Sequence, residues 1–138
     1  MIAKRLQPDN PREWLNRAKS SFVKAQYPAE GVYLEDLCFD AQQAAEKAIK
    51  SILIFHQIRF PYIHDLAELI RLVVETGELV PENIYRAASL TRFAVSMRYP
   101  GVIEPVTMDE YQEALKIAKD VIVWAEEIIE HGSRKSIV

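Results

Sequence analysis

The sequence predicts an all-α fold, an antiparallel bundle of about five helices joined by short connections. Apolar residues recur every three or four positions through most of the chain, which is the period of a helix with one buried face. No stretch alternates apolar and polar residues in the manner of a strand. Only 4 of the 138 residues are glycine, a low number for a turn-rich β fold. The length suits a single domain, 1–138, with a core over about residues 10–131.

The first two helices are predicted from capping residues and apolar spacing. Asn10 and Pro11 suit the cap and the first position of a helix, which Tyr27-Pro28 ends. The second helix, about residues 32–56, has the longest apolar pattern, and its alanines would let a neighbouring helix approach closely. It is therefore expected at the centre of the bundle. Its other face carries five polar residues: Asp36, Asp40, Gln43, Lys47 and Lys50.

The third and fourth helices are predicted from residues that start and stop helices. A carboxylate near the start of a helix is favourable, so Asp65 is expected to begin the third helix, which ends at Gly77. Pro81 suits the first turn of a fourth helix, and Pro100 cannot continue it. The fourth helix is therefore predicted to run from Pro81 to Pro100.

A long fifth helix is predicted for the C-terminal part of the chain. Thr107 followed three residues later by Glu110 reads as a capping box, in which each side chain bonds the other residue's backbone. The apolar face that follows is wide, so this helix is expected to pack against two neighbours. Residues 132–138 are expected to form a loose tail.

Composition and charge narrow the class of protein. The 17 basic and 20 acidic residues give a net charge of −3, which argues against coating nucleic acid through bulk electrostatics but permits a local basic cluster. The single cysteine, Cys38, lies in an apolar helical pattern, so no disulfide framework is expected and a reducing compartment is the default. No apolar run is long enough to cross a membrane, and the N-terminus lacks the pattern of a signal peptide. We therefore expect a cytoplasmic protein with no membrane contact.

The common catalytic signatures are absent from the sequence. It has no glycine-rich phosphate loop, no paired-cysteine zinc spacing and no HExxH. Its three histidines, at positions 56, 64 and 131, are scattered, and their spacing does not indicate a metal cluster. No metal and no cofactor are expected.

One polar group on the fourth predicted helix has the chemistry of an anion site. Ser96 and Tyr99 follow Arg92 on one stripe, and a guanidinium offers paired donors that match phosphate. Arg98 lies about 120° around an ideal helix from Arg92. Because a residue before proline is pushed out of helical geometry, the backbone near Pro100 departs from the ideal and the two arginines could converge. The alternative is that each arginine pairs with a glutamate on a neighbouring helix.

A second polar group lies on the second predicted helix. It consists of Asp40, Gln43 and Lys47, spaced three and four residues apart. It is either a second wall of a binding site or simply a face turned to solvent. His64, next to Asp65, most simply belongs to the start of the third helix.

Three segments together resemble the HEPN domain family. They are DAQQAAEKAIKSIL, YIHDLAELI and SLTRFAVSMRYP, and the resemblance covers about residues 10–131. It implies a bundle of about five helices that commonly dimerises, with a polar cleft at or near the dimer interface and links to nucleotides or RNA. It also implies that the chain belongs to a toxin–antitoxin or stress module with a minimal nucleotidyltransferase as partner.

The resemblance departs from the catalytic branch of the family at one position. In that branch, a metal-independent ribonuclease uses an arginine followed, after four to six variable residues, by a histidine. From Arg92, the matching positions hold Met97, Arg98 and Tyr99, and none is histidine. Arginine stays protonated and is a poor general base. The RYP variant resembles the sacsin-like branch, for which nucleotide binding is the natural expectation.

The sequence therefore supports one leading hypothesis and two alternatives. The leading hypothesis is a homodimer that binds nucleotide or RNA phosphate near the end of the fourth helix, without catalysis. The binding residues it predicts are Arg92, Arg98, Tyr99, Ser96, Lys47 and Gln43. The first alternative is a ribonuclease, with Arg92, Arg98 and His64 as its candidate catalytic residues. The second is a non-catalytic dimeric interaction domain.

Overall fold

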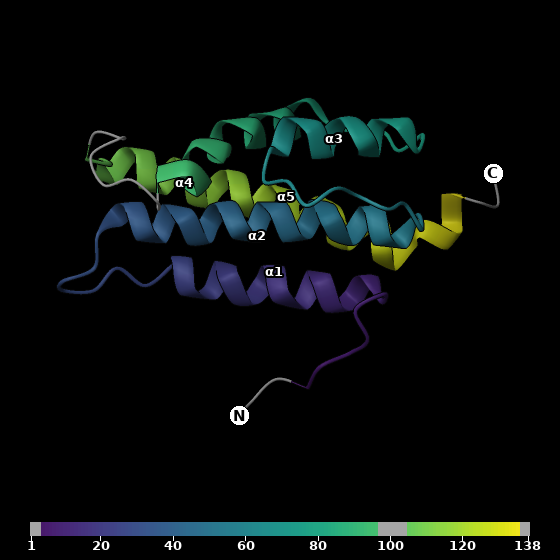
Figure 1. Ribbon diagram of the computed structural model, residues 1–138, viewed down its shortest axis with the longest axis horizontal. Coiled ribbons are helices and arrows are strands. Elements are labelled where there is room, and N and C mark those ends of the chain that lie inside the picture. Colours follow the sequence, from purple (N-terminus) through teal and green to yellow (C-terminus); the bar gives the residue numbers. More distant parts are fainter. Residues whose placement is uncertain (1–3, 97–104, 136–138) are drawn as a thin grey trace.

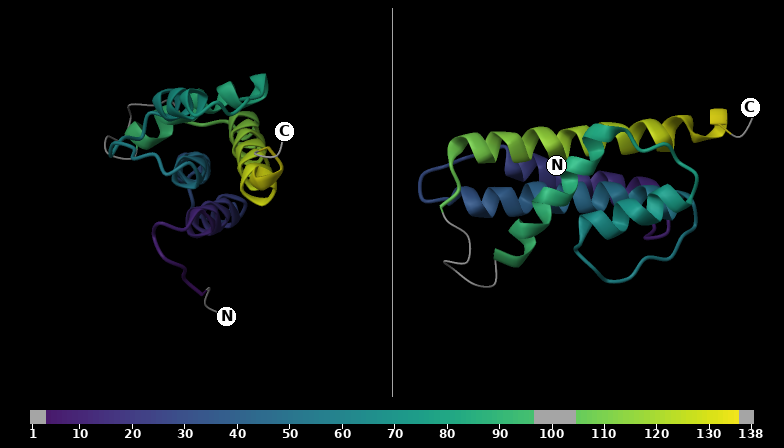
Figure 2. Two further views of the ribbon diagram at one scale, coloured as in Figure 1. Left: turned by 90° about the vertical axis from the view of Figure 1, so that its right-hand side faces the viewer. Right: turned by 90° about the horizontal axis from the view of Figure 1, so that it is seen from above.

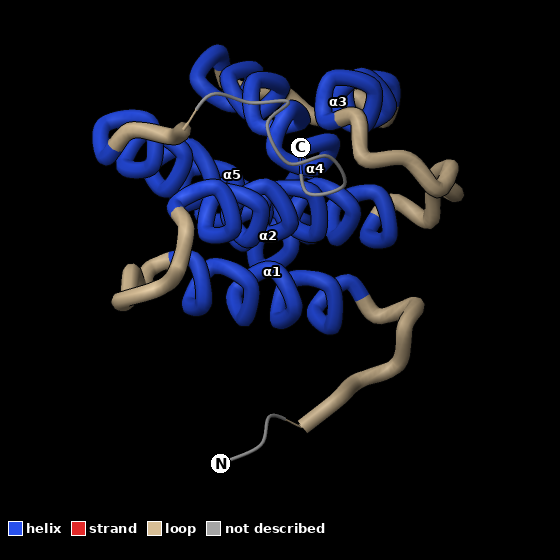
Figure 3. The backbone as a smooth tube through the Cα atoms, turned by 60° about the vertical axis from the view of Figure 1, so that its left-hand side comes forward, coloured by secondary structure: helices blue, strands red, loops and turns tan. Residues whose placement is uncertain are grey.

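The computed structural model describes residues 4–96 and 105–135, which are helical over most of their length (Figures 1 and 3). No strand occurs in these two ranges. The helical elements are α1 (Pro11–Ala25), α2 (Leu34–Phe55), α3 (Leu66–Glu75), the 3₁₀-helix η1 (Glu82–Leu90), α4 (Thr91–Ser96) and α5 (Met108–Lys135). The predicted all-α bundle of about five helices is confirmed.

Helix α2 forms the centre of the bundle, as predicted. It packs against every other helical element. Figure 2 (left) shows it between α1 on one side and α3 on the other, with α5 beside it. Four alanines of α2 have no exposed surface: Ala41, Ala44, Ala45 and Ala48. Because these side chains are small, the backbones of the neighbouring helices can approach α2 closely. A longer side chain would not fit at these positions.

Three predicted helix starts are confirmed by hydrogen bonds. The Asn10 side chain accepts from the Arg12 backbone N–H at 2.9 Å. Asp65 accepts from the backbone of the residue two positions on, at 3.1 Å. Thr107 and Glu110 form the reciprocal capping box, with distances of 3.0 and 3.1 Å. Each bond satisfies a backbone donor that a helix leaves free in its first turn.

The predicted fourth helix differs from what the structure contains. Residues Glu82–Leu90 form a 3₁₀-helix, and only Thr91–Ser96 form an α-helix. The buried residues of η1 are Ile84, Ala87 and Leu90, which are three apart. A 3₁₀-helix has three residues per turn, so this spacing puts all of them on the core side. Pro100 lies outside the described residues.

The predicted loose tail is also partly wrong, because α5 continues to Lys135. Gly132 lies against the ring of Phe55 in α2, where an added Cβ would come within 2.1 Å of the ring. The absence of a side chain at this position lets the end of α5 stay close to the end of α2.

Candidate functional site

Arg92, the second residue of α4, points toward the start of α5. Its Nη2 donates to Oε2 of Glu110 at 3.3 Å, and its guanidinium carbon lies 4.5 Å from the centre of the Phe93 ring. Both side chains of the ion pair are well exposed, at 49% and 41%. Arg92 therefore pairs with a glutamate on a neighbouring helix, as the alternative interpretation of this residue predicted.

A shallow cleft of about 250 Å³ lies beside Arg92, between η1, α4 and α5. It is lined by Ser89, Leu90, Arg92, Phe93, Asp109, Glu110, Glu113, Ala114 and Ile117. The lining holds three carboxylates and one guanidinium, and Arg86 of η1 pairs with one of the carboxylates, Glu113, at 3.7 Å. The remaining charge of the cleft is negative. An anion that binds Arg92 must compete with Glu110 and approach two other carboxylates. The sequence prediction missed this acidic wall because its residues belong to the first turns of α5.

The other residues predicted beside Arg92 are only partly described. Ser96 is the last residue of α4, and its side chain lies outside the described part of the chain. Arg98 and Tyr99 also lie outside the described residues. The convergence of Arg92 and Arg98 stays a prediction.

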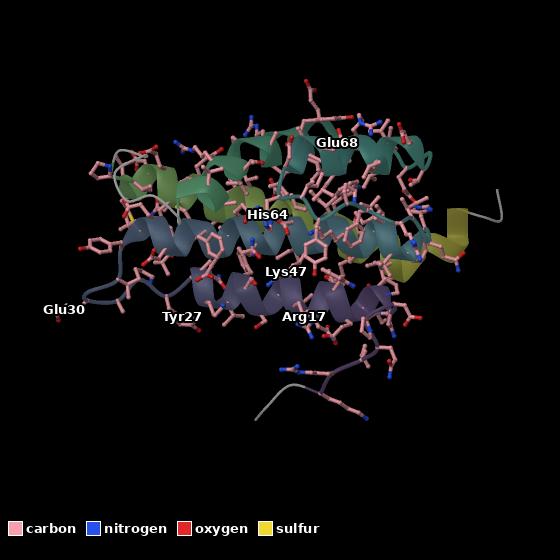
Figure 4. All side chains as sticks on the ribbon, in the orientation of Figure 1. Arg17, Tyr27, Glu30, Lys47, His64 and Glu68 are labelled. Atoms are coloured by element: carbon pink, nitrogen blue, oxygen red, sulfur yellow. The ribbon has the colours of Figure 1, made fainter. Side chains whose placement is uncertain are left out.

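Lys47 and Gln43 lie on a different side of α2 from α4. The Nζ atom of Lys47 donates to the hydroxyl of Ser21 in α1 at 3.0 Å, and Figure 4 shows Lys47 between α1 and α2. Burial lowers the pKa of Lys47, and the positive charges of Lys24 and Arg17 lower it further. The Gln43 amide donates to the Gln42 side chain at 2.7 Å.

Helix geometry shows that Lys47 is also remote from Arg92 along α2. Arg92 lies close enough to Cys38 for its charge to oppose the rise of the Cys38 pKa. Lys47 follows Cys38 by nine residues, or about two and a half turns, which is about 13.5 Å of rise and puts the two residues on opposite sides of α2. The structure therefore does not bring Lys47 next to Arg92.

His64 forms part of a buried polar cluster that the sequence prediction missed. Its Nδ1 lies 2.8 Å from Oε1 of Glu46, whose whole residue is 4% exposed. Glu46 also accepts from Gln42 at 2.9 Å and from Lys50 at 2.9 Å. Burial raises the pKa of Glu46, but the hydrogen bonds from Lys50, Gln42 and His64 outweigh burial and hold it below its usual value.

Lys50 belongs to this cluster and is 5% exposed, although it lies in the polar stripe of α2. The connector between α2 and α3 covers it, because Phe60 of that connector lies 5.2 Å from its Nζ atom. A spacing of four residues joins Gln42, Glu46 and Lys50, so all three lie on one stripe of the helix. The four-residue spacing was visible in the sequence, but the covering of Lys50 by Phe60 was not.

Cys38 has the properties of a core residue. It is fully buried, and burial raises the pKa of its thiol to about 12. A thiol with this pKa is protonated at neutral pH and is a poor nucleophile. The prediction that Cys38 belongs to the core is confirmed.

Neither a metal-binding cluster nor a membrane-spanning helix occurs in the part of the chain that the structure describes. Over residues 4–96 and 105–135, no three histidine, cysteine or acidic side chains come together as metal ligands. None of the helices in these ranges is both long and apolar enough to span a bilayer.

Comparison with known proteins identifies the family. The HEPN domain model matches residues 11–128. The crystal structure of ST0689, an archaeal HEPN homologue, is 28% identical with a TM-score of 0.70, and the match covers 92% of this chain and 99% of that one. TT1696 from Thermus thermophilus is 30% identical with a TM-score of 0.70, over 86% and 98% of the two chains. No match was found among the curated proteins. The chain belongs to the HEPN domain family.

Proposed function

We propose that this HEPN-domain protein binds the phosphate of a nucleotide or RNA at Arg92, in the first turn of α4. Arg92 is the primary contact, and Arg98, Tyr99 and Ser96 follow it in the sequence as further contacts. The observation that supports the proposal is that the Arg92 guanidinium is half exposed and that its ion pair with Glu110 is exposed too. Such a pair contributes about 0–1 kcal/mol, so a phosphate can replace Glu110 at low cost.

Glu110 would keep a structural role when Arg92 binds a phosphate. One of its carboxylate oxygens accepts from the Thr107 backbone, and the other contacts Arg92. The bonds with Thr107 lower the pKa of Glu110 more than Arg92 does. Glu110 therefore stays ionised and in place as the cap of α5 when its partner turns away.

The acidic wall of the cleft makes a second cation necessary. Asp109 repels a phosphate, and so does Glu113, although Arg86 pairs with it at 3.7 Å. Arg92 supplies one positive charge from within the cleft. We propose that Arg98 supplies the other charge, and that binding depends strongly on salt, as expected for contacts to phosphate. Arg98→Ala should then weaken binding as much as Arg92→Ala.

We further propose the biological setting that the family resemblance implies. The protein acts in the cytoplasm as a homodimer, in a toxin–antitoxin or stress module with a minimal nucleotidyltransferase. Co-purification with the product of a neighbouring gene would test the partner. Sedimentation of the purified chain would test the dimer.

A ribonuclease is the second candidate function, and one observation favours it. The His64 imidazole is held through Nδ1 by the buried carboxylate of Glu46, while 52% of its side chain remains exposed. A carboxylate that orients an imidazole leaves the other ring nitrogen free for proton transfer. Under this alternative, the wild-type protein cleaves RNA and His64→Ala does not, whereas under the binding function neither protein cleaves it.

A thermal-shift screen against ATP, GTP, their monophosphates and a short RNA tests the binding function. A ligand at one hundred times its Kd should stabilise the protein by about 2.7 kcal/mol. Arg92→Ala should reduce this stabilisation to about 1.4 kcal/mol or less, since it weakens binding at least ten-fold. Arg71→Ala is the matched control, because Arg71 also forms exposed ion pairs with glutamates, Glu68 and Glu75 of α3, and none of these residues lines the cleft. Equal loss of stability in both variants, with ligand binding intact, would instead support the interaction-domain alternative.

A further inference from the structure

Lys47 differs from the other lysines that the structure describes. Four of them pair with a carboxylate: Lys19, Lys24, Lys50 and Lys116. Lys4 and Lys119 are exposed to solvent. Lys47 is half-buried, and in the ranges that the structure describes no carboxylate lies within ion-pair distance of its ammonium. It is therefore the one described lysine that is partly buried without an ionic partner.

The Lys47 ammonium is held between α1 and α2 by a buried hydroxyl. Its Nζ atom donates to Oγ of Ser21 at 3.0 Å, and Ser21 is 2% exposed. Ser21 lies four residues after Arg17 and three before Lys24, so the three residues share one stripe of α1. Figure 4 shows Lys47 between the two helices and Arg17 on α1. Two further cations thus flank the serine that holds Lys47.

The carboxylates of this region are engaged by the two flanking cations. The Arg17 guanidinium donates to Glu13 at 2.5 Å. The Nζ atom of Lys24 lies 3.6 Å from a carboxylate oxygen of Asp40. The Lys47 ammonium therefore has less water around it, and two like charges near it, without a carboxylate of its own. Both conditions disfavour the charged form of an amine.

The pKa of Lys47 is lowered in agreement with this geometry. Burial is the largest cause, and the charges of Lys24 and Arg17 lower the pKa further. The carboxylates of Glu46 and Asp40 act in the opposite direction but do not outweigh burial and the two cations. A lysine that is desolvated or lies beside another cation has a larger fraction of neutral amine, which is its nucleophilic form.

We propose that Lys47 is the preferred acylation site of this chain and that its acyl donor is an acyl phosphate. The inference does not depend on the phosphate site, because Lys47 is remote from Arg92. The neutral amine attacks the carbonyl carbon of the donor, an N–C bond forms, and the C–O bond to phosphate breaks. The phosphate leaves with that electron pair and takes the proton that the nitrogen loses. Acetyl phosphate thus gives acetyl-lysine and inorganic phosphate.

The surroundings of Lys47 fit an anionic donor. The side chains of Arg17 and Lys24 are 51% and 65% exposed, so a donor in solution can reach them. Their charges attract the phosphate of the donor and stabilise it as it leaves. The hydroxyl of Ser21 accepts one N–H of Lys47, so the lone pair of the neutral amine points away from Ser21. Acylation removes the charge of Lys47 and with it the repulsion from the two cations.

Incubation of the purified protein with acetyl phosphate at neutral pH, followed by mass spectrometry of its peptides, measures the acetylation rate of each lysine. We expect Lys47 to react faster than the exposed Lys119 of α5, although Lys119 is more accessible. Lys50 should stay unmodified, because Glu46 holds it as a buried ammonium at 2.9 Å.

Two variants test the flanking charges. Lys24→Gln and Arg17→Gln should each slow the acetylation of Lys47 about three-fold, which is the effect of an electrostatic energy of about kT. Lys24 is exposed, so its replacement leaves the fold intact. Lys19→Gln is the matched control, because Lys19 is also a cation of α1 but pairs with Glu126 of α5. It should leave the rate at Lys47 unchanged.

A neutral reagent, N-acetoxysuccinimide, separates the nucleophilicity of Lys47 from the attraction of an anionic donor. The preference for Lys47 over Lys119 should be smaller with this reagent than with acetyl phosphate. Equal preference with the two reagents would overturn the choice of an acyl phosphate. If Lys47 reacts no faster than Lys119 with acetyl phosphate, or if all three variants react alike at Lys47, the proposed site is overturned.

Discussion

Replacing Glu46 by glutamine tests the buried cluster beneath the connector. Glu46 is 4% exposed and accepts hydrogen bonds from Gln42, Lys50 and His64. Lys50 is 5% exposed, so its ammonium would remain in the interior without a charged partner. Removing one partner of a buried ion pair costs about 3–5 kcal/mol, because the other charge stays desolvated. Since the glutamine carbonyl still accepts a hydrogen bond, we expect a loss of about 3 kcal/mol, at the lower end of that range.

Urea denaturation followed by circular dichroism at pH 7 measures this loss directly. For a domain of this size, a loss of about 3 kcal/mol lowers Tm by roughly 10 °C. Glu68→Gln is the control, because Glu68 forms an exposed ion pair with Arg71 and should lose less than about 1 kcal/mol. Combining Glu46→Gln with Lys50→Met should recover most of the stability, because no charge is then left in the interior.

Two results would refute this reasoning. Glu46→Gln could lose less than about 1 kcal/mol, which would mean that water reaches Lys50. Alternatively, the double variant could be less stable than Glu46→Gln alone. In that case, packing by the Lys50 side chain would matter more than its charge.

Three further predictions concern acid, capping and core packing. The pKa of Glu46 is lowered in the folded state, so its contribution is complete above the ordinary pKa of about 4.5 and is lost as the pH falls below it. Melting curves from about pH 6 to about pH 3 should show a shallower decline for Glu46→Gln. Thr107→Ala removes the cap of α5 and should cost about 1 kcal/mol in urea. Ala45→Leu overpacks a fully buried position and should cost about 1–3 kcal/mol in the same assay.

The parts of the fold that the sequence predicted well depend on local chemistry. Asn10, Asp65 and Thr107 cap helices through bonds to residues two or three positions away, so their neighbours in the sequence suffice to predict them. The central position of α2 follows from a run of alanines on one helix face, which is also a local pattern. The three-residue spacing of the apolar positions in η1 was also present in the sequence. Pro81 and Pro100 nevertheless led to the prediction of a single helix across this segment.

The parts that the sequence did not predict depend on contacts between distant segments. Lys50 is buried because Phe60 folds back over it, and polar spacing on α2 cannot show that cover. The acidic surroundings of Arg92 come from Glu110 and its neighbours on α5, eighteen residues later. The family resemblance pointed to the segment around Arg92 but did not indicate that carboxylates of α5 line the cleft beside it.

Calorimetric titration of the wild-type protein and Arg92→Ala with a short single-stranded RNA tests the phosphate site most directly. A hydrogen bond to a charged group contributes about 1.5–3 kcal/mol, so Arg92→Ala should weaken binding at least ten-fold. Its free energy of unfolding should change by less than about 1 kcal/mol, because the ion pair with Glu110 is exposed. Equal affinity in the two proteins, or no binding by the wild type, would contradict a phosphate site at Arg92.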